Sequence, residues 1–234
     1  GMSYPSTGSD GACIRLAHKL GHTVQRCSPA LVPIVTNEEY PKELQGLALK
    51  NVTLKVRENK RIIFEELGEL LFTHFGVSGP LVLSASSRME EKNFPFTFME
   101  IDLKPGLTHE QLNVRLLKDL EANQRKALGN SLFELLPKSL VPVVLEEAGL
   151  DSAKAVNQVT KEERIRLCET IKKLVLTPKA FRPIEEAIIT RGGVSVREIN
   201  PSTMESRLIK GLYFAGEMID TDAYTGGFNI QIAV

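Results

Sequence analysis

The sequence has no excess of charge of either sign, and this limits the partners it is expected to have. Lysine plus arginine and aspartate plus glutamate both number 29, so the formal net charge is zero. Nucleic-acid binders usually carry a basic excess or stripe, because contacts with phosphates supply much of their affinity. We therefore expect no nucleic-acid partner.

Cysteine is scarce as well. The cysteines, which lie far apart, are Cys13, Cys27 and Cys168. An odd number at these spacings excludes a disulfide framework and a Cys-x-x-Cys pair, and it favours a reducing compartment. His18 and His22 have the spacing of a zinc pair on a helix, but Gly21 should end that helix between them. We expect no metal site.

Long apolar runs are missing too. No stretch approaches the ~20 residues of a membrane-spanning helix. The opening segment GMSYPSTGSD lacks the basic region and apolar run of a signal peptide. We expect a cytoplasmic protein that does not associate with membranes.

The apolar residues that are present suffice for a core, and the first of them are arranged as strands. The chain has 234 residues, of which 42% are hydrophobic. Apolar positions mostly alternate over 47–56, which predicts a strand. The segments 61–66 and 69–75 continue this pattern, with a tight hairpin expected at Gly68. Gly79-Pro80 predicts a helix start, because proline suits the first helical turn.

Residues 106–176 have a helical pattern instead. Thr108 with Gln111, and Thr160 with Glu163, match the capping box, in which each partner satisfies a backbone N–H group of the other. Apolar residues follow each box at helical spacing. They are Leu112, Leu116, Leu117 and Leu120 after the first box, and Leu167, Ile171 and Leu174 after the second. Shorter helices over 132–136 and 140–145 complete a predicted helical subdomain.

The C-terminal region combines two features that suit a bound cofactor. The apolar run 211–215 precedes Gly216-Glu217, where glycine allows close approach of a ligand and the acid can accept hydrogen bonds from hydroxyl groups. Gly226-Gly227 precedes an expected helix, whose free N–H groups suit a phosphate or a ring oxygen. Each feature alone is equally typical of an ordinary turn or glycine hinge, but their order is more specific. Asp220 and Asp222 are expected to be solvated turn residues.

These motifs resemble a family of flavoproteins. GLYFAGE at 211–217 resembles the C-terminal flavin motif of flavoproteins with two dinucleotide-binding domains. The whole stretch 190–233 is similar to the BaiN/YhiN-like, or aminoacetone-oxidase-like, family of NAD(P)/FAD-dependent oxidoreductases. GMSYPSTGSDG at the start, LQGLALKNVTLKV at 44–56 and GELLFTHFGVSGPLVL at 68–83 match the same family in the same order. The resemblance covers essentially the entire chain.

The resemblance implies the domain organisation. The expected fold is α+β: a small β-barrel or sandwich with an inserted helical subdomain, flanked by remnants of an α/β FAD-binding domain. Residues 1–29 and 186–234 would be parts of the FAD-binding domain. Residues 30–185 would form an insert domain, with the helical subdomain at 106–173.

The resemblance also implies an activity and its residues. The protein would be an FAD-dependent oxidoreductase that transfers hydride between a small-molecule substrate and FAD, with NAD(P)H as an optional further partner. The residues expected to bind the cofactor are Gly216, Glu217, Thr225, Gly226, Gly227, Asn229 and Ile230. Those expected to line the substrate pocket are Ser3, Tyr4, Pro5, Thr190, Gly192 and Gly193, the last three in a turn. Glu217 would bind the ribityl or pyrophosphate part of FAD.

One part of the family's pattern is missing from this sequence. The Gly-x-Gly-x-x-Gly unit, which grips the adenosine diphosphate half of FAD, does not occur. We therefore expect a piece of a longer protein, truncated at both ends, that binds little or no FAD and is inactive by itself. The alternative is a non-catalytic insert domain that serves substrate gating or protein interaction. Flavin absorbance of the purified protein favours the first reading, and a colourless protein favours the second.

Overall fold

The computed structural model describes residues 1–223 and 228–233. The chain divides into two compact units. The first unit comprises Gly1–Val35, Ser78–Glu91 and Ala180–Val234, and the second comprises Thr36–Val77 and Lys92–Lys179. Both units mix helices with antiparallel strand pairs, so the prediction of an α+β fold is confirmed.

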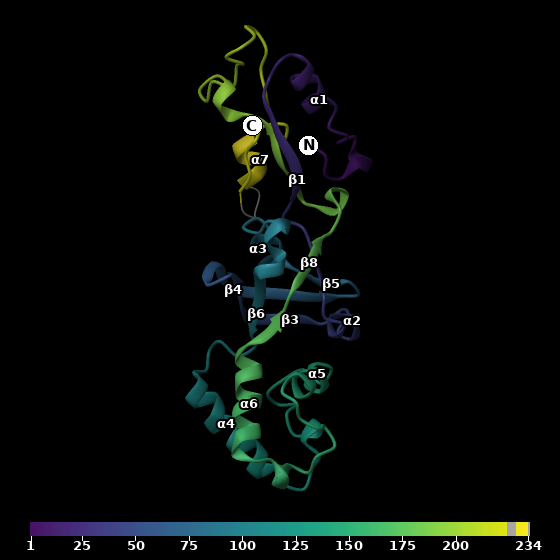
Figure 1. Ribbon diagram of the computed structural model, residues 1–234, viewed down its shortest axis with the longest axis vertical. Helices are drawn as coiled ribbons and strands as arrows, with labels where there is room; N and C mark the ends of the chain where they lie inside the picture. Colours follow the sequence, from purple (N-terminus) through teal and green to yellow (C-terminus); the bar gives the residue numbers. More distant parts are fainter. Residues whose placement is uncertain (224–227, 234) are drawn as a thin grey trace. The chain divides into compact units, whose positions relative to one another are not determined.

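The elements of each unit are interleaved along the chain (Figure 1). The first unit contains α1 (Ala12–Lys19), β1 (Val24–Ala30), α3 (Pro80–Ser86), β9 (Ile189–Val194) and α7 (Phe228–Ala233). The second contains α2 (Tyr40–Glu43), β3 (Ala48–Glu58), β4 (Arg61–Thr73), β6 (Thr97–Asp102), α4 (His109–Ala122), α5 (Leu140–Glu147), α6 (Lys161–Lys172) and β7 (Leu174–Leu176). The chain passes between the units within β2 (Ile34–Thr36), β5 (Gly76–Ser78) and β8 (Pro178–Phe181). The 3-10 helices are η1 (Pro5–Thr7), η2 (Glu91–Phe96), η3 (Leu128–Asn130), η4 (Val156–Gln158), η5 (Ile184–Glu186) and η6 (Val196–Glu198).

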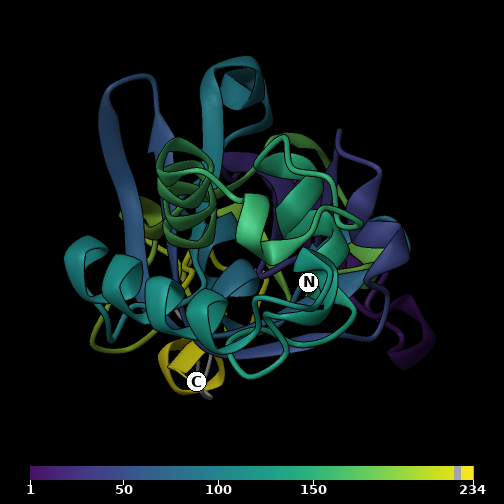
Figure 2. The same ribbon diagram turned by 90° about the horizontal axis from the view of Figure 1, so that it is seen from below.

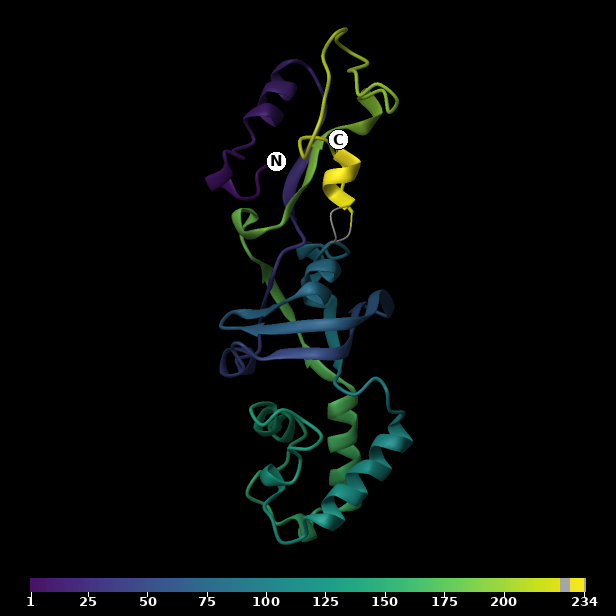
Figure 3. The ribbon, with the colours of Figure 1, turned by 180° about the vertical axis from the view of Figure 1, so that it is seen from behind.

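The long β3–β4 hairpin organises the sheet of the second unit (Figure 3). The sheet has the strand order β7-β6-β3-β4-β5-β2-β8. Val52, Leu54 and Val56 of β3 are buried, as the alternating pattern predicts. The hairpin expected at Gly68 is not there, because Gly68 pairs with Val52 inside a continuous β4. The chain reverses instead beside Asn59, which adopts a positive φ of 54° that asparagine tolerates better than most residues.

The segment between β6 and β7 is helical, and both predicted capping boxes are confirmed. Thr108 Oγ1 accepts from the Gln111 N–H at 3.2 Å, and Gln111 Oε1 accepts from the Thr108 N–H at 2.9 Å. Thr160 and Glu163 repeat this pattern at the start of α6. The Lys154 ammonium group, 2.7 Å from the Glu163 carboxylate, and the capping bond hold the pKa of Glu163 below its ordinary value.

The α4 and α6 helices pack against each other through their apolar stripes. Figure 2 looks down the axis of α6, with α4 seen lengthwise beside it. Leu116 and Ile171 are fully buried, whereas Leu117 is 39% exposed and lies off the stripe. Leu174 belongs to β7, because α6 ends at Lys172. The helix expected over 132–136 is a series of turns, since Pro137 interrupts the pattern after it.

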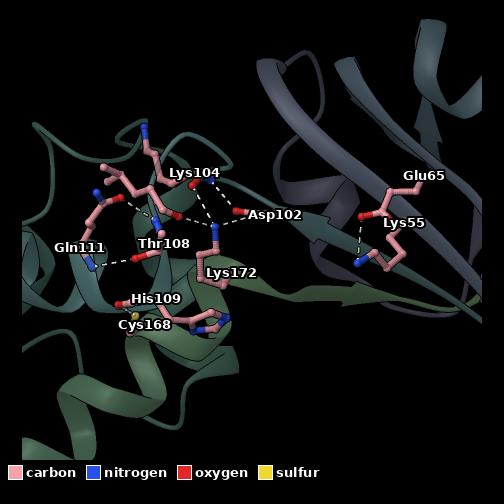
Figure 4. A network of polar contacts seen from close by, with 10 residues as sticks. Lys55, Glu65, Asp102, Lys104, Thr108, His109, Gln111, Cys168 and Lys172 are labelled. Carbon is pink, nitrogen blue, oxygen red and sulfur yellow. Dashed lines mark hydrogen bonds and ion pairs between the residues drawn. The ribbon is translucent and has the colours of Figure 1, made fainter.

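A buried lysine fastens the end of α6 to the loop before α4 (Figure 4). The Lys172 side chain is 9% exposed, and its ammonium group lies 2.6 Å from Asp102 Oδ2. The same group donates to the carbonyl oxygens of Lys104 at 3.0 Å and Leu107 at 2.7 Å. A buried charge is tolerated only with such partners, so these bonds fix where α4 begins relative to α6.

The first unit is built on the antiparallel pair of β1 and β9. Helix α1 packs on this pair, with Ala17 in one buried apolar cluster with Val194 and Phe214. Residues 190–193, expected as a turn, lie within β9 because they pair with β1. The apolar run 211–215 forms no continuous strand and makes only an isolated bridge from Tyr213 to Glu205. Ile219, just beyond them, bridges Val194 in parallel.

Candidate functional site

Glu217 lies at the centre of a cluster built from three distant parts of the sequence. Ser3 Oγ donates to Glu217 Oε2 at 3.3 Å. The backbone N–H groups of Met2 and Ser3 both donate to Thr190 Oγ1, at 2.6 and 3.2 Å. Ser3 and Thr190 are buried, and Glu217 is half-buried. The structure therefore brings together the acid of one predicted set and two residues of the other.

Gly1 packs directly on the carboxylate of this cluster. A Cβ atom at Gly1 would collide with Glu217 Oε2 and would lie 3.2 Å from Thr190 Oγ1. A larger residue at this position would have to displace the Glu217 carboxylate. The chain segment 1–3 thus forms one wall around Glu217, and that role was not apparent from the sequence.

Gly192 and Gly193 have a packing role in β9. A Cβ atom at Gly192 would collide with the carbonyl oxygen of Arg26, and one at Gly193 with that of Met218. Gly193 contacts Met218 at the point where the two chain segments are also joined by a hydrogen bond, which the Val194 N–H donates to Met218 O at 2.7 Å. Gly192 therefore lets β9 approach β1, and Gly193 lets it approach the segment that carries Glu217.

The remaining predicted residues are distributed differently. Tyr4 and Pro5 are exposed at the start of η1, and Tyr4 has a positive φ of 50°. Gly216 forms a turn whose carbonyl accepts from the Ile219 N–H at 3.2 Å. Thr225, Gly226 and Gly227 lie outside the described residues, and Ile230 lies in α7. The Asn229 side chain exchanges two hydrogen bonds with the backbone of Ala223, at 2.7 and 2.9 Å.

Arg191 and Asp222 form an ion pair that the sequence analysis missed. Arg191 Nε lies 3.3 Å from Asp222 Oδ2, so Asp222 is an exposed loop residue, as expected, but is also ion-paired. Burial raises the pKa of the Asp220 carboxyl above its ordinary value, and the Asp222 carboxylate acts in the same direction while Arg191 opposes it. The sequence held one signal for a separate role of Arg191. Side chains alternate along a strand, so Arg191 points to the face opposite Thr190.

Two kinds of feature are absent from the described part of the chain. Among residues 1–223 and 228–233, no three histidine, cysteine, aspartate or glutamate side chains lie together as metal ligands would. Within the same residues, no helix has both the length and the apolar character needed to cross a membrane.

Comparison with known proteins identifies the family. Residues 28–189 match the family described as HI0933-like protein barrel and H2TH domain. The chain belongs to the HI0933-like family. The matched region runs from the end of β1 through β8 and includes the helices from α2 to α6. The expected resemblance to a flavoprotein-like family is confirmed at this level.

Similar proteins extend along the full length of this HI0933-like chain. It is 32% identical over 233 residues to the ribosomal RNA dihydrouridine synthase of Escherichia coli strain K12, covering 100% of this chain and 56% of that protein. The protein of the same name from Haemophilus influenzae is 31% identical, with 55% of it covered. The 3-dehydro-bile acid delta(4,6)-reductase of Clostridium scindens is 28% identical, with 57% covered. The chain thus spans a little over half the length of each relative.

These relatives correct one prediction. The balanced charge led us to expect no nucleic-acid partner, and that expectation is wrong, because two of the relatives are named for ribosomal RNA. Net charge sums over the whole chain and does not report how arginines are placed locally. A zero sum is therefore compatible with an RNA-binding surface on an HI0933-like protein.

Proposed function

We propose that the protein carrying this chain is an FAD-dependent oxidoreductase that reduces a carbon–carbon double bond conjugated to a carbonyl group. The observation that carries the proposal is the Glu217 cluster. Residues 1–3, Thr190 and the Gly216-Glu217 turn converge there in a chain of the HI0933-like family. Such convergence is expected of a cofactor site and not of a solvent-exposed turn.

The names of the relatives support this reaction class. Dihydrouridine is uridine with two hydrogens added to the ring double bond, which is conjugated to a ring carbonyl. A 3-dehydro-bile acid with delta(4,6) unsaturation likewise has double bonds conjugated to a ketone. In both cases the double bond is reduced when hydride adds to its carbon farther from the carbonyl group and a proton adds to its nearer carbon. One chemistry therefore accounts for both names.

The chain's own residues fit the flavin's polyol part. Glu217 offers a half-buried carboxylate that can accept hydrogen bonds from ribityl hydroxyls, and the Ser3 hydroxyl orients it. Gly1 packs against the same carboxylate, and the Thr190 hydroxyl oxygen accepts from the backbone N–H groups of Met2 and Ser3 and so holds this segment in place. Bound FAD, once reduced by NAD(P)H as the proposed electron donor, would supply the hydride. The protein's contribution is to position the substrate and exclude competing reactions.

We propose uridine in ribosomal RNA as the substrate, because the two relatives named for it are more similar to this chain than the bile-acid reductase is. A conjugated steroid ketone is the second candidate, supported by the third relative. We further propose that residues 106–173 form a helical subdomain inserted into the barrel. Residues 1–29 and 186–234 would then be parts of the FAD-binding domain.

The test uses the full-length protein that contains this chain. Flavin absorbance and the cofactor released on denaturation should identify FAD. Incubation with NADPH or NADH and an unmodified ribosomal RNA transcript should give dihydrouridine, which mass spectrometry detects as two added hydrogens in the digested nucleosides. A conjugated steroid ketone should be reduced slowly or not at all, as followed by its ultraviolet absorbance. A colourless protein, or one inactive on both substrates, would refute the proposal and favour the non-catalytic alternative.

A further inference from the structure

A cavity of about 300 Å³ lies within the first unit on the face of β9 opposite Thr190. The described residues that line it are Ser87, Arg88, Arg191, Asp222 and Ala223. They come from the end of α3, from β9 and from the loop that follows Glu217. Apart from Arg191, which lies within the 190–193 segment expected to line the substrate pocket, none of them was predicted to bind cofactor or substrate.

Arg191 is held rigidly at the edge of this cavity. One Nη2 hydrogen is donated to the carbonyl oxygen of Ser87, and Nε–H is donated to Asp222 Oδ2 at 3.3 Å. The side chain is only 26% exposed. A guanidinium has five N–H donors, so several remain for a ligand after these two bonds. Nη1 has no hydrogen-bond partner among the described residues.

The cavity's other polar groups favour an anion. Two guanidinium groups and one carboxylate line it, so N–H donors outnumber carboxylate acceptors in its lining. The Ser87 hydroxyl is buried and has no hydrogen-bond partner in the part of the chain that the structure describes. A buried hydroxyl without a partner is costly, and a ligand oxygen that accepts from it would remove that cost. A planar fork of donors beside a hydroxyl suits a tetrahedral oxyanion.

We propose that this cavity binds one phosphate group of the RNA, next to the uridine that is reduced. The inference rests on the proposed function and extends it. Arg191 donates to the phosphate oxygens from a fixed position, Asp222 is a positioning residue that holds the guanidinium, and the Ser87 hydroxyl donates to the same phosphate. Contacts of this kind set the register of a nucleic acid on a protein. They would place the target base relative to the Glu217 side of β9.

The test combines protein variants with RNA probes in the full-length protein. The variants are Arg191→Gln, Arg191→Lys, which keeps the charge without the fork, and Asp222→Asn. Arg197→Gln is the matched control, since Arg197 is an exposed arginine of the same unit that does not line this cavity. The probes are a short uridine-containing RNA and a set in which one phosphate at a time is replaced by an uncharged methylphosphonate.

Binding to each probe is measured over a range of salt concentrations. Arg191→Gln should weaken binding of the unmodified RNA about tenfold and reduce the salt slope by about one. Arg191→Lys should be intermediate. Neutralising one particular linkage should weaken binding to the native protein but have little further effect on Arg191→Gln. Arg197→Gln should remain sensitive to that same linkage.

Flavin content and melting temperature of every variant serve as controls for folding. Loss of FAD from a folded Arg191→Gln protein would overturn the inference, because the cavity would then belong to the flavin. The inference would be overturned too if neutralising each linkage weakened RNA binding by the same factor in the native protein and in Arg191→Gln. The inference would also be overturned if Arg191 affected only the binding of a bile acid with a free carboxylate, and not the binding of its methyl ester or of RNA. If the native protein reduces RNA but shows no coupling to Arg191, only the phosphate site fails; if it reduces no RNA, the proposed RNA substrate fails, and with it the phosphate site.

Discussion

Replacement of Glu217 by alanine tests whether this acid binds the cofactor or only stabilises the fold. The carboxylate accepts from Ser3 Oγ at 3.3 Å, and the Ser3 hydroxyl has a second acceptor, the Ile188 carbonyl, at 3.5 Å. Loss of the acid therefore leaves Ser3 with an alternative partner. The unfolding free energy of the apoprotein should fall by about 1 kcal/mol or less.

The effect on FAD should be much larger. A hydrogen bond to a charged acceptor contributes roughly 1.5–3 kcal/mol, which corresponds to a loss of about tenfold to a hundredfold in affinity for FAD. Glu217→Gln should lose less, because the amide oxygen still accepts a hydrogen bond. Glu185→Ala is the matched control, since Glu185 is an exposed acid of the same unit.

The assay is titration of full-length apoprotein with FAD, followed by flavin fluorescence, together with a melting curve of each apoprotein. Unchanged FAD affinity in Glu217→Ala would remove this residue from the site and would undermine the flavin assignment of the whole cluster. A large fall in melting temperature with no specific loss of affinity would show that the acid is structural.

Further predictions concern the fold of this chain. Leu116→Ala should cost about 2–5 kcal/mol of unfolding free energy and Leu117→Ala less than about 1 kcal/mol, because only the first is buried; urea titration followed by circular dichroism suits a chain without tryptophan, and equal costs would mean that the helix face is wrong. Gly193→Ala should lower the melting temperature more than Gly211→Ala, since both have positive φ but only the first added Cβ would meet backbone; equal shifts would contradict a role in close packing. The depressed pKa of Glu163 means that its contribution to stability is present above the unfolded-state pKa and lost as pH falls through the folded-state pKa. Glu163→Gln should therefore flatten the acid limb of a plot of stability against pH, and an unchanged limb would refute this.

Local sequence patterns predicted most of the second unit because each rests on neighbouring residues. The capping boxes at Thr108 and Thr160 need only a residue three positions away, and the alternation along β3 needs only a buried face. The hairpin at Gly68 was mispredicted for the same reason. Glycine also fits an extended strand, and only the pairing of β4 with β3 reveals which role it has.

The sequence by itself determined the helices and strands that have strong periodicity and the family resemblance. It also singled out Glu217 as a candidate, because this acid follows a glycine at the end of an apolar run. These are properties of short stretches of chain. Only the tertiary structure decided that Gly1, Ser3 and Thr190 lie around that acid, because the hydrogen bonds that hold this cluster join residues 187 to 214 positions apart. The same holds for Arg191, which in the sequence is one polar residue in a glycine-rich motif. Only folding brings the Ser87 carbonyl and Asp222 within hydrogen-bonding distance of its guanidinium group, and no local pattern encodes these contacts.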